Sequence, residues 1–102
     1  MKKIEPYNKA LFKERMQGKP KPFIDKLTTS QRQCVCRYSN AVKLNAVIRW
    51  KTRMAKASIR GKEMSYVLKV PEQRISEWLN LKHEPAESTF DAFEKILYNK
   101  GV

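Results

Sequence analysis

The residues that could carry out covalent chemistry are few in this chain and far apart. His83 is the single histidine, and Cys34 and Cys36 are the two cysteines. A catalytic base must lie within hydrogen-bond reach of its proton, and structural zinc needs four nitrogen or sulfur ligands. The sequence has no Ser/His/Asp set, no phosphate-binding glycine loop and too few zinc ligands. We therefore expect no enzyme, no metal site and no cofactor, and we interpret the cysteines as small apolar side chains on a helix.

The distribution of charge suggests binding rather than catalysis. Residues 1–61 hold 16 Lys/Arg and 3 Asp/Glu, a net charge of +13, whereas residues 62–102 hold 6 Lys/Arg and 7 Asp/Glu, a net charge of −1. A concentrated positive field attracts nucleic acid without reading its sequence. The asymmetry predicts a polyanionic partner for the first part of the chain.

The length of 102 residues predicts one small domain, or a domain with an extension. No run approaches the ~20 apolar residues that a membrane span requires. The first residues, MKKIEPYNK, contain lysines but lack the apolar core of a secretory signal. The sequence therefore predicts a cytoplasmic protein without a membrane partner.

The first 40 residues read as a basic extension. A short helix is expected over 6–16, with Pro6 in its first turn and Gly18 beyond its end. The stretch QGKPKPF over 17–23 indicates an extended linker, because proline favours extended backbone before it. The Thr-Thr-Ser run at 28–30 offers N-cap oxygens for a second helix from Gln31. That helix either ends at Ser-Asn, 39–40, or continues through it.

Helical periodicity strengthens from Ala41 onward. In the helix that begins near Ala41, the side that we expect to face the core carries Leu44, Val47, Ile48, Trp50, Met54 and Ala55. Lys51 falls on that apolar side as a misfit. A shorter helix follows near 61–69, where the apolar residues are Met64, Val67 and Leu68.

Pro71 opens a further helix, in which Ile75, Trp78 and Leu79 face inward. KHEP, 82–85, predicts a turn. The last helix, over 87–101, has Ser88 as its expected N-cap and Gly101 just past its end. Its core face carries Phe90, Phe93, Ile96 and Leu97.

No segment alternates with a period of two, so the predicted fold class is all-α. We expect a small helical bundle that contains a helix-turn-helix motif and has a basic N-terminal extension. The predicted boundaries are 1–40 for the extension (short helix, Pro/Lys linker and second helix) and 41–102 for the helix-turn-helix domain.

Two short helices with a tight connection are the layout of a helix-turn-helix DNA reader. The stretches KEMSYVLKV and PEQRISEWLNLKHEP resemble the Cro/C1-type (XRE) helix-turn-helix regulators. That family has an apolar–small pair in the first helix, a turn valine, and a recognition helix of the form I-S-x-W-x-N-G-K-x-x-P. The matching positions in this sequence are Met64, Ser65, Leu68, Val70, Ile75, Ser76, Trp78, Asn80, Lys82 and Pro85.

This sequence departs from the family pattern at four positions. Lys69 and Leu81 stand where the family usually has glycine, which predicts ordinary helical dihedral angles there or a slightly longer helix. Gly61 replaces a glutamine that often braces the base-reading side chains, and Pro71 replaces a capping Ser or Thr. The resemblance covers about 46–102, one helix fewer than the family's usual five. Residues 1–40 are therefore expected to supply missing core or a dimer face.

The resemblance implies roles for the outward face of the recognition helix. The residues expected to read bases are Glu72, Gln73, Arg74, Ser76 and Glu77. The residues expected to contact phosphate are Arg49, Arg53, Lys56, Arg60, Lys62, Asn80 and Lys82, together with Lys19 and Lys21 of the linker. Basic residues would supply affinity while the acidic readers select bases, since glutamate accepts a hydrogen bond from cytosine N4.

Three functions remain open at this stage. The first is a sequence-specific DNA-binding transcriptional regulator of phage or plasmid type, a repressor acting as a homodimer on a palindromic operator at its own or a neighbouring promoter. The second is the antitoxin of a toxin–antitoxin pair, because VPEQRISEWLN is similar to a stretch of HigA-type antitoxins. The third is a basic inhibitor that binds RNA or protein without reading bases.

Overall fold

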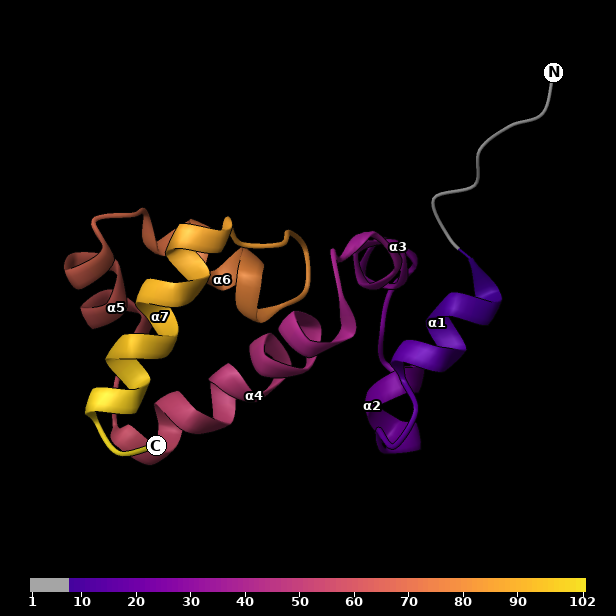
Figure 1. Cartoon of the computed structure of the whole chain (residues 1–102), viewed down its shortest axis with the longest axis horizontal. Coiled ribbons are helices and arrows are strands. Elements are labelled where there is room, and N and C mark those ends of the chain that lie inside the picture. The colour runs from indigo at the N-terminus through magenta and orange to yellow at the C-terminus, as the bar shows by residue number, and fades with distance from the viewer. Residues whose placement is uncertain (1–7) are drawn as a thin grey trace, which may run out of the picture.

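The computed structural model describes residues 8–102, which form seven helices and no strand. The helices are α1 (Lys9–Arg15), α2 (Lys21–Asp25), α3 (Thr29–Arg37), α4 (Ala41–Ala57), α5 (Gly61–Leu68), α6 (Glu72–Leu79) and α7 (Glu87–Asn99). The all-α prediction is confirmed. Figure 1 shows α4 running along the molecule, with α5, α6 and α7 gathered at one end of it and α1, α2 and α3 at the other. None of the helices described is both long and apolar enough to cross a bilayer.

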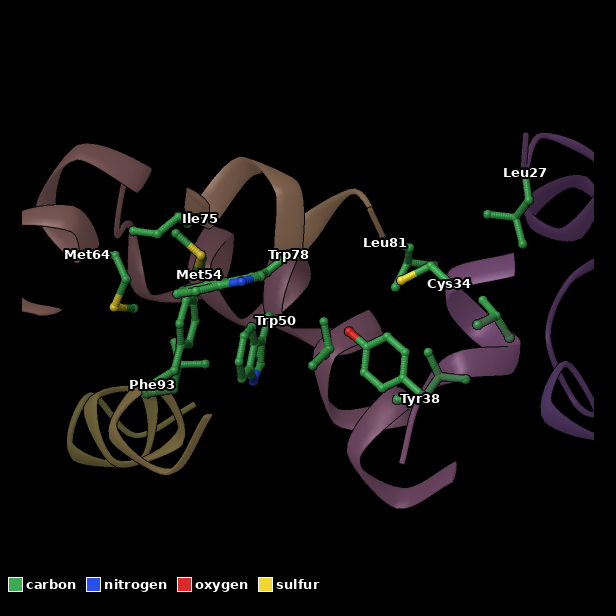
Figure 2. Packing of buried hydrophobic residues seen from close by; sticks show 14 of the residues in the cluster. Leu27, Cys34, Tyr38, Trp50, Met54, Met64, Ile75, Trp78, Leu81 and Phe93 are labelled. Atoms are coloured by element: carbon green, nitrogen blue, oxygen red, sulfur yellow. The ribbon is translucent and has the colours of Figure 1, made fainter. Parts of the chain in front are cut away.

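One hydrophobic core runs through both ends of the molecule. Trp50 of α4 lies at its centre and stacks on Phe93 of α7, with ring centroids 3.7 Å apart and planes 2° from parallel (Figure 2). Residues on either side of position 40 belong to the same buried cluster, including Cys34 and Val35 of α3. The prediction that residues 1–40 supply core is confirmed for the part of the extension that the structure describes.

Local sequence signals explain where α3 and α4 begin. Thr28 accepts a hydrogen bond from the backbone N–H of Gln31, and the Gln31 side chain accepts one from the N–H of Thr28, which completes a capping box. Asn40 caps α4 by accepting from the N–H of Lys43. The Ser-Asn pair at 39–40 therefore separates two helices, which settles the alternative left open by the sequence.

Four helix ends share one backbone motif. Ser58, Lys69, Leu81 and Gly101 have φ of 56°, 58°, 56° and 79°, in the left-handed region. In each case the next residue donates its N–H to the carbonyl five positions back, as in Val70 to Ser65 and Lys82 to Glu77. The prediction of ordinary helical angles at Lys69 and Leu81 was wrong. The next residue can donate to an unpaired carbonyl at the helix end only if these residues adopt positive φ, whether or not they are glycine.

The extended conformation predicted for 17–23 is also wrong, since α2 begins at Lys21. Pro20 is its N-cap and Pro22 lies in its first turn. The first N–H groups of a helix have no intrahelical partner, so proline there loses no hydrogen bond. The helix expected over 6–16 is observed as Lys9–Arg15 with Asn8 as its cap, while Pro6 lies outside the described residues.

Smaller corrections concern α4, α5 and α7. Ala86, not Ser88, is the N-cap of α7. Ala55 is exposed although it was placed on the core side of its helix, and Val67, one of the apolar residues of the next helix, is 57% exposed. The predicted core residues Trp50, Met64, Ile75, Trp78, Phe93 and Leu97 are all buried.

Lys69→Gly should raise the free energy of unfolding by about 1 kcal/mol, because left-handed backbone costs an L-residue ~1–2 kcal/mol and Lys69 is exposed. Leu81→Gly is the matched control. It relieves the same strain but removes a side chain only 4% exposed, at a cost of about 1.5–3 kcal/mol, so it should lower stability. Urea denaturation of both variants checks this. A destabilised Lys69→Gly protein would contradict the strain at that turn.

Candidate nucleic-acid interface

The inner face of α6 fixes which side chains point outward. Ile75 and Trp78 are 1% and 5% exposed and point from α6 into the core beside Trp50 and Phe93 (Figure 2). Glu72, Gln73 and Ser76 are exposed on the other side of the helix. Because residues three and four apart share a helix face, these three form one outward strip. The structure thus brings together three of the five predicted base-reading residues.

Glu72 lies against the N-terminus of α5. A Cβ at Gly61 would stand 3.8 Å from Glu72 Cγ and 3.9 Å from Glu72 Oε1, so the two helices meet at this point. Arg60 and Lys62 flank Gly61 and are exposed. Two predicted phosphate contacts, Arg60 and Lys62, therefore lie beside the first turn of α6. Glu72 lies next to Gly61, the position where the family often has a glutamine.

Arg74 and Glu77 interact with each other on α6. Arg74 Nη1 lies 3.8 Å from Glu77 Oε1, and the two side chains are 56% and 25% exposed. Exposed pairs of this kind contribute little to stability. Glu77 lies four residues after Gln73 and so adjoins the strip, but it is less exposed than Glu72, Gln73 and Ser76 and is engaged with Arg74.

Asn80, expected to contact phosphate, instead forms hydrogen bonds within the protein through both its side chain and its backbone carbonyl. Its Nδ2 donates to the carbonyl of Ser76 at 2.8 Å, and its Oδ1 accepts from Lys51 Nζ at 3.3 Å. Its backbone carbonyl accepts from Gln31 Nε2 at 2.7 Å. The end of α6 is therefore tied both to α4 and to α3 of the N-terminal extension.

The cations of α4 divide between two sides of that helix. Arg53 faces α7, where it pairs with Glu94 at 2.9 Å and donates to the carbonyl of Val102. Arg49 and Lys56 lie four residues before and three after Arg53, so they share its face. Lys51 is the cation of α4 that reaches α6. Sequence reasoning missed it, although a lysine on an otherwise apolar helix side was the signal.

The two lysines of the predicted linker, Lys19 and Lys21, lie in different surroundings. Lys19 Nζ donates to Asn45 Oδ1 at 2.8 Å, which fixes the segment before α2 to α4. Lys21 is exposed at the start of α2. Lys82 and His83 are both exposed in the turn that follows α6. Of these residues, Lys82 lies next to the end of the outward strip.

The described part of the chain has no cluster of metal ligands, and Cys34 is placed for packing. No group of three His, Cys, Asp or Glu side chains converges in this part of the chain. Cys34 is buried, and burial, with the nearby Glu84 charge, raises the pKa of its thiol to about 11. A thiolate is the reactive form of cysteine, so Cys34 is a packing residue at neutral pH.

Comparisons of the chain with protein-family models, with curated proteins and with solved structures each found no match.

Glu84 fastens the turn after α6 to the start of α4. Its carboxylate accepts hydrogen bonds from the N–H and hydroxyl of Ser39 and lies 3.2 Å from Lys43 Nζ. Burial alone would raise the pKa of Glu84, but the hydrogen bonds from Ser39 and Lys43 outweigh it and lower the pKa below its ordinary value. The turn is thus held by a carboxylate that is stabilised in its charged form.

Glu84→Gln should lower stability at neutral pH and change how stability depends on acid. Because the folded-state pKa is depressed, the wild-type contribution is present above the ordinary value of 4.5 and is lost as the pH falls from there through the folded pKa. The gap between the two proteins in the free energy of unfolding should therefore close below 4.5. Urea denaturation across a pH series measures the gap, with exposed Glu14→Gln as the control. A gap independent of pH would contradict the assignment.

Proposed function

We propose that this protein is a sequence-specific DNA-binding transcriptional regulator that inserts α6 into the major groove. The observation that carries the proposal is the outward strip of Glu72, Gln73 and Ser76 on a helix whose other face is seated in the core. An α-helix fits the major groove, where side chains can distinguish all four base pairs. Carboxylate, amide and hydroxyl groups are the kinds of side chain that pair with base edges.

The backbone on either side of α6 supports the same function. Lys69 and Leu81 stand where the Cro/C1-type family usually has glycine, and both hold positive φ. The Ser65 hydroxyl donates to the carbonyl of Val70, which braces the turn between α5 and α6. Positive φ is the conformation that glycine adopts readily, so the backbone at these two positions supports the resemblance although the glycines are absent.

Cations around the outward strip supply the positive charge that binding to DNA phosphates requires. Arg60 and Lys62 border its first turn, Arg74 lies on α6 itself, and Lys82 follows its end. Contacts to phosphate position a protein on the duplex, whereas contacts to bases select the sequence. We assign phosphate contact to these four residues, including Arg74, which the sequence placed among the base readers and which stays 56% exposed beside Glu77. We leave out Arg53, which is only 21% exposed and paired with Glu94, and Arg49 and Lys56, which share its face.

The proposal extends to the setting of the protein. It acts in the cytosol as a repressor of its own or a neighbouring promoter, and it binds a palindromic operator as a homodimer. Two-fold operators match two-fold proteins when the half-sites lie about one helical turn, ~34 Å, apart. The resemblance to helix-turn-helix regulators supports this arrangement.

Selection of binding sites from randomised duplex DNA tests the proposal. The wild-type protein should enrich one motif, and Gln73→Ala should relax its preference at one base pair by about 1–3 kcal/mol, because the lost contact is to a base edge. Lys62→Gln should instead weaken binding to all sequences and reduce the salt slope by about one.

Lys95→Gln is the matched control, since Lys95 is an exposed lysine on α7 rather than beside α6. It should leave both motif and salt slope nearly unchanged. Enrichment of no motif by the wild-type protein, with steeply salt-dependent binding to every duplex, would contradict base reading.

A further inference from the structure

An apolar groove lies at the end of the molecule away from α5 and α7. It is open to solvent, has a volume of about 640 Å³ and is lined by residues of α1, α2 and α3. Figure 1 shows these helices at the opposite end of α4 from α5 and α7. None of its lining residues belongs to α6, so the groove is separate from the proposed DNA-reading surface.

The floor of the groove is apolar and held in place. Phe12 of α1 and Met16 at its C-cap form the base of the groove and are 5% and 3% exposed, whereas half-buried Ile24 of α2 is more accessible. The Arg32 guanidinium lies 4.9 Å from the centre of the Phe12 ring and donates hydrogen bonds to the carbonyls of Ile24 and Leu27. Arg32 thus joins the three helices and holds the floor in shape.

The rim of the groove is mainly positive. Lys9 and Lys13 are exposed there beside a single acid, Glu14, and the Arg32 guanidinium of the floor adds a third positive charge. The ion pairs formed within residues 8–102 all lie elsewhere, at Lys43–Glu84, Arg53–Glu94 and Arg74–Glu77. The groove therefore presents an apolar floor between cations whose charge is not neutralised by the described part of the chain.

We propose that this groove docks a segment of a partner protein whose apolar side chains are flanked by Asp or Glu. Apolar anchors would fill the floor over Phe12, Met16 and Ile24, as in helix-in-groove recognition, while the acids face Lys9 and Lys13. The proposal does not depend on DNA binding.

Other occupants fit these features less well. A nucleic acid backbone would satisfy the cations but would leave the apolar floor unused. The chain's own residues 1–7, MKKIEPY, carry two lysines and one glutamate, so their net charge has the same sign as the rim. Charge complementarity thus favours an acidic partner segment.

Selection from a library of random peptides on the immobilised full-length protein tests the proposal. Enriched peptides should combine apolar residues with Asp or Glu. The double variant Lys9→Glu, Lys13→Glu should bind them about tenfold more weakly, because two attractive rim contacts become repulsive. Both lysines are exposed, so the folded structure should persist, which circular dichroism verifies.

The control is the double variant Lys95→Glu, Lys100→Glu, which makes the same change of net charge on exposed residues of α7 and its end. It should bind the peptides as the wild type does, and amide NMR shifts on peptide addition should centre on α1 and α2. Equal loss in both variants, shifts centred on α6, or peptide binding that appears only when residues 1–7 are deleted would overturn the proposal. Because duplex DNA binding is measured separately, either proposal can fail alone.

Discussion

The burial of Ile75 and Trp78 beside the Trp50–Phe93 stack is the interaction on which the proposed function depends. Trp50 is fully buried, and its indole N–H donates to Glu94, so the largest apolar side chain of the core also has its polar atom satisfied. The stack brings α4 and α7 together and leaves a surface onto which α6 packs. Once that side of α6 is buried, Glu72, Gln73 and Ser76 must face solvent, because helix geometry allows no other arrangement.

The N-terminal extension serves this arrangement and adds to it. Gln31 both completes the capping box of α3 and donates to the carbonyl of Asn80, so the residue that starts one helix also fastens the end of α6. Arg15 of α1 donates to the carbonyls of Val35 and Tyr38, at the end of α3. The same layer presents a basic groove on its outer side. The N-terminal helices therefore support the end of α6 through Gln31 and, as proposed, attract acidic partners through the lysines of α1.

Sequence periodicity predicted the elements from α4 onward because they bury strong apolar faces, and Thr28 and Asn40 announced their helices through side-chain caps. Sequence patterns did not predict the backbone at the helix ends, where hydrogen bonds that close the turn override the conformational preference of the residue. Lys69 and Leu81 adopt positive φ because the orphan carbonyls of α5 and α6 need donors, and Leu81 gains burial in return. The proline pair at 20 and 22 was read as an arm because a first-turn proline and a linker proline look alike in sequence.

Contacts between residues that are far apart in the sequence could not be predicted from it. Nothing in the spacing of Arg53 and Glu94, or of Gln31 and Asn80, shows that these residues meet, since 41 and 49 positions separate them. Two expected phosphate contacts, Arg53 and Asn80, consequently proved to be engaged within the protein, whereas Lys51 was overlooked.

Photo-crosslinking from defined positions tests most directly whether α6 is the surface that meets DNA. A benzophenone side chain would be placed at Gln73 on the outward strip or at Tyr98, which is 79% exposed on α7. With a duplex selected by the wild-type protein, we expect crosslinks from position 73 and none from position 98. Crosslinks from position 98 but not from position 73 would contradict the account.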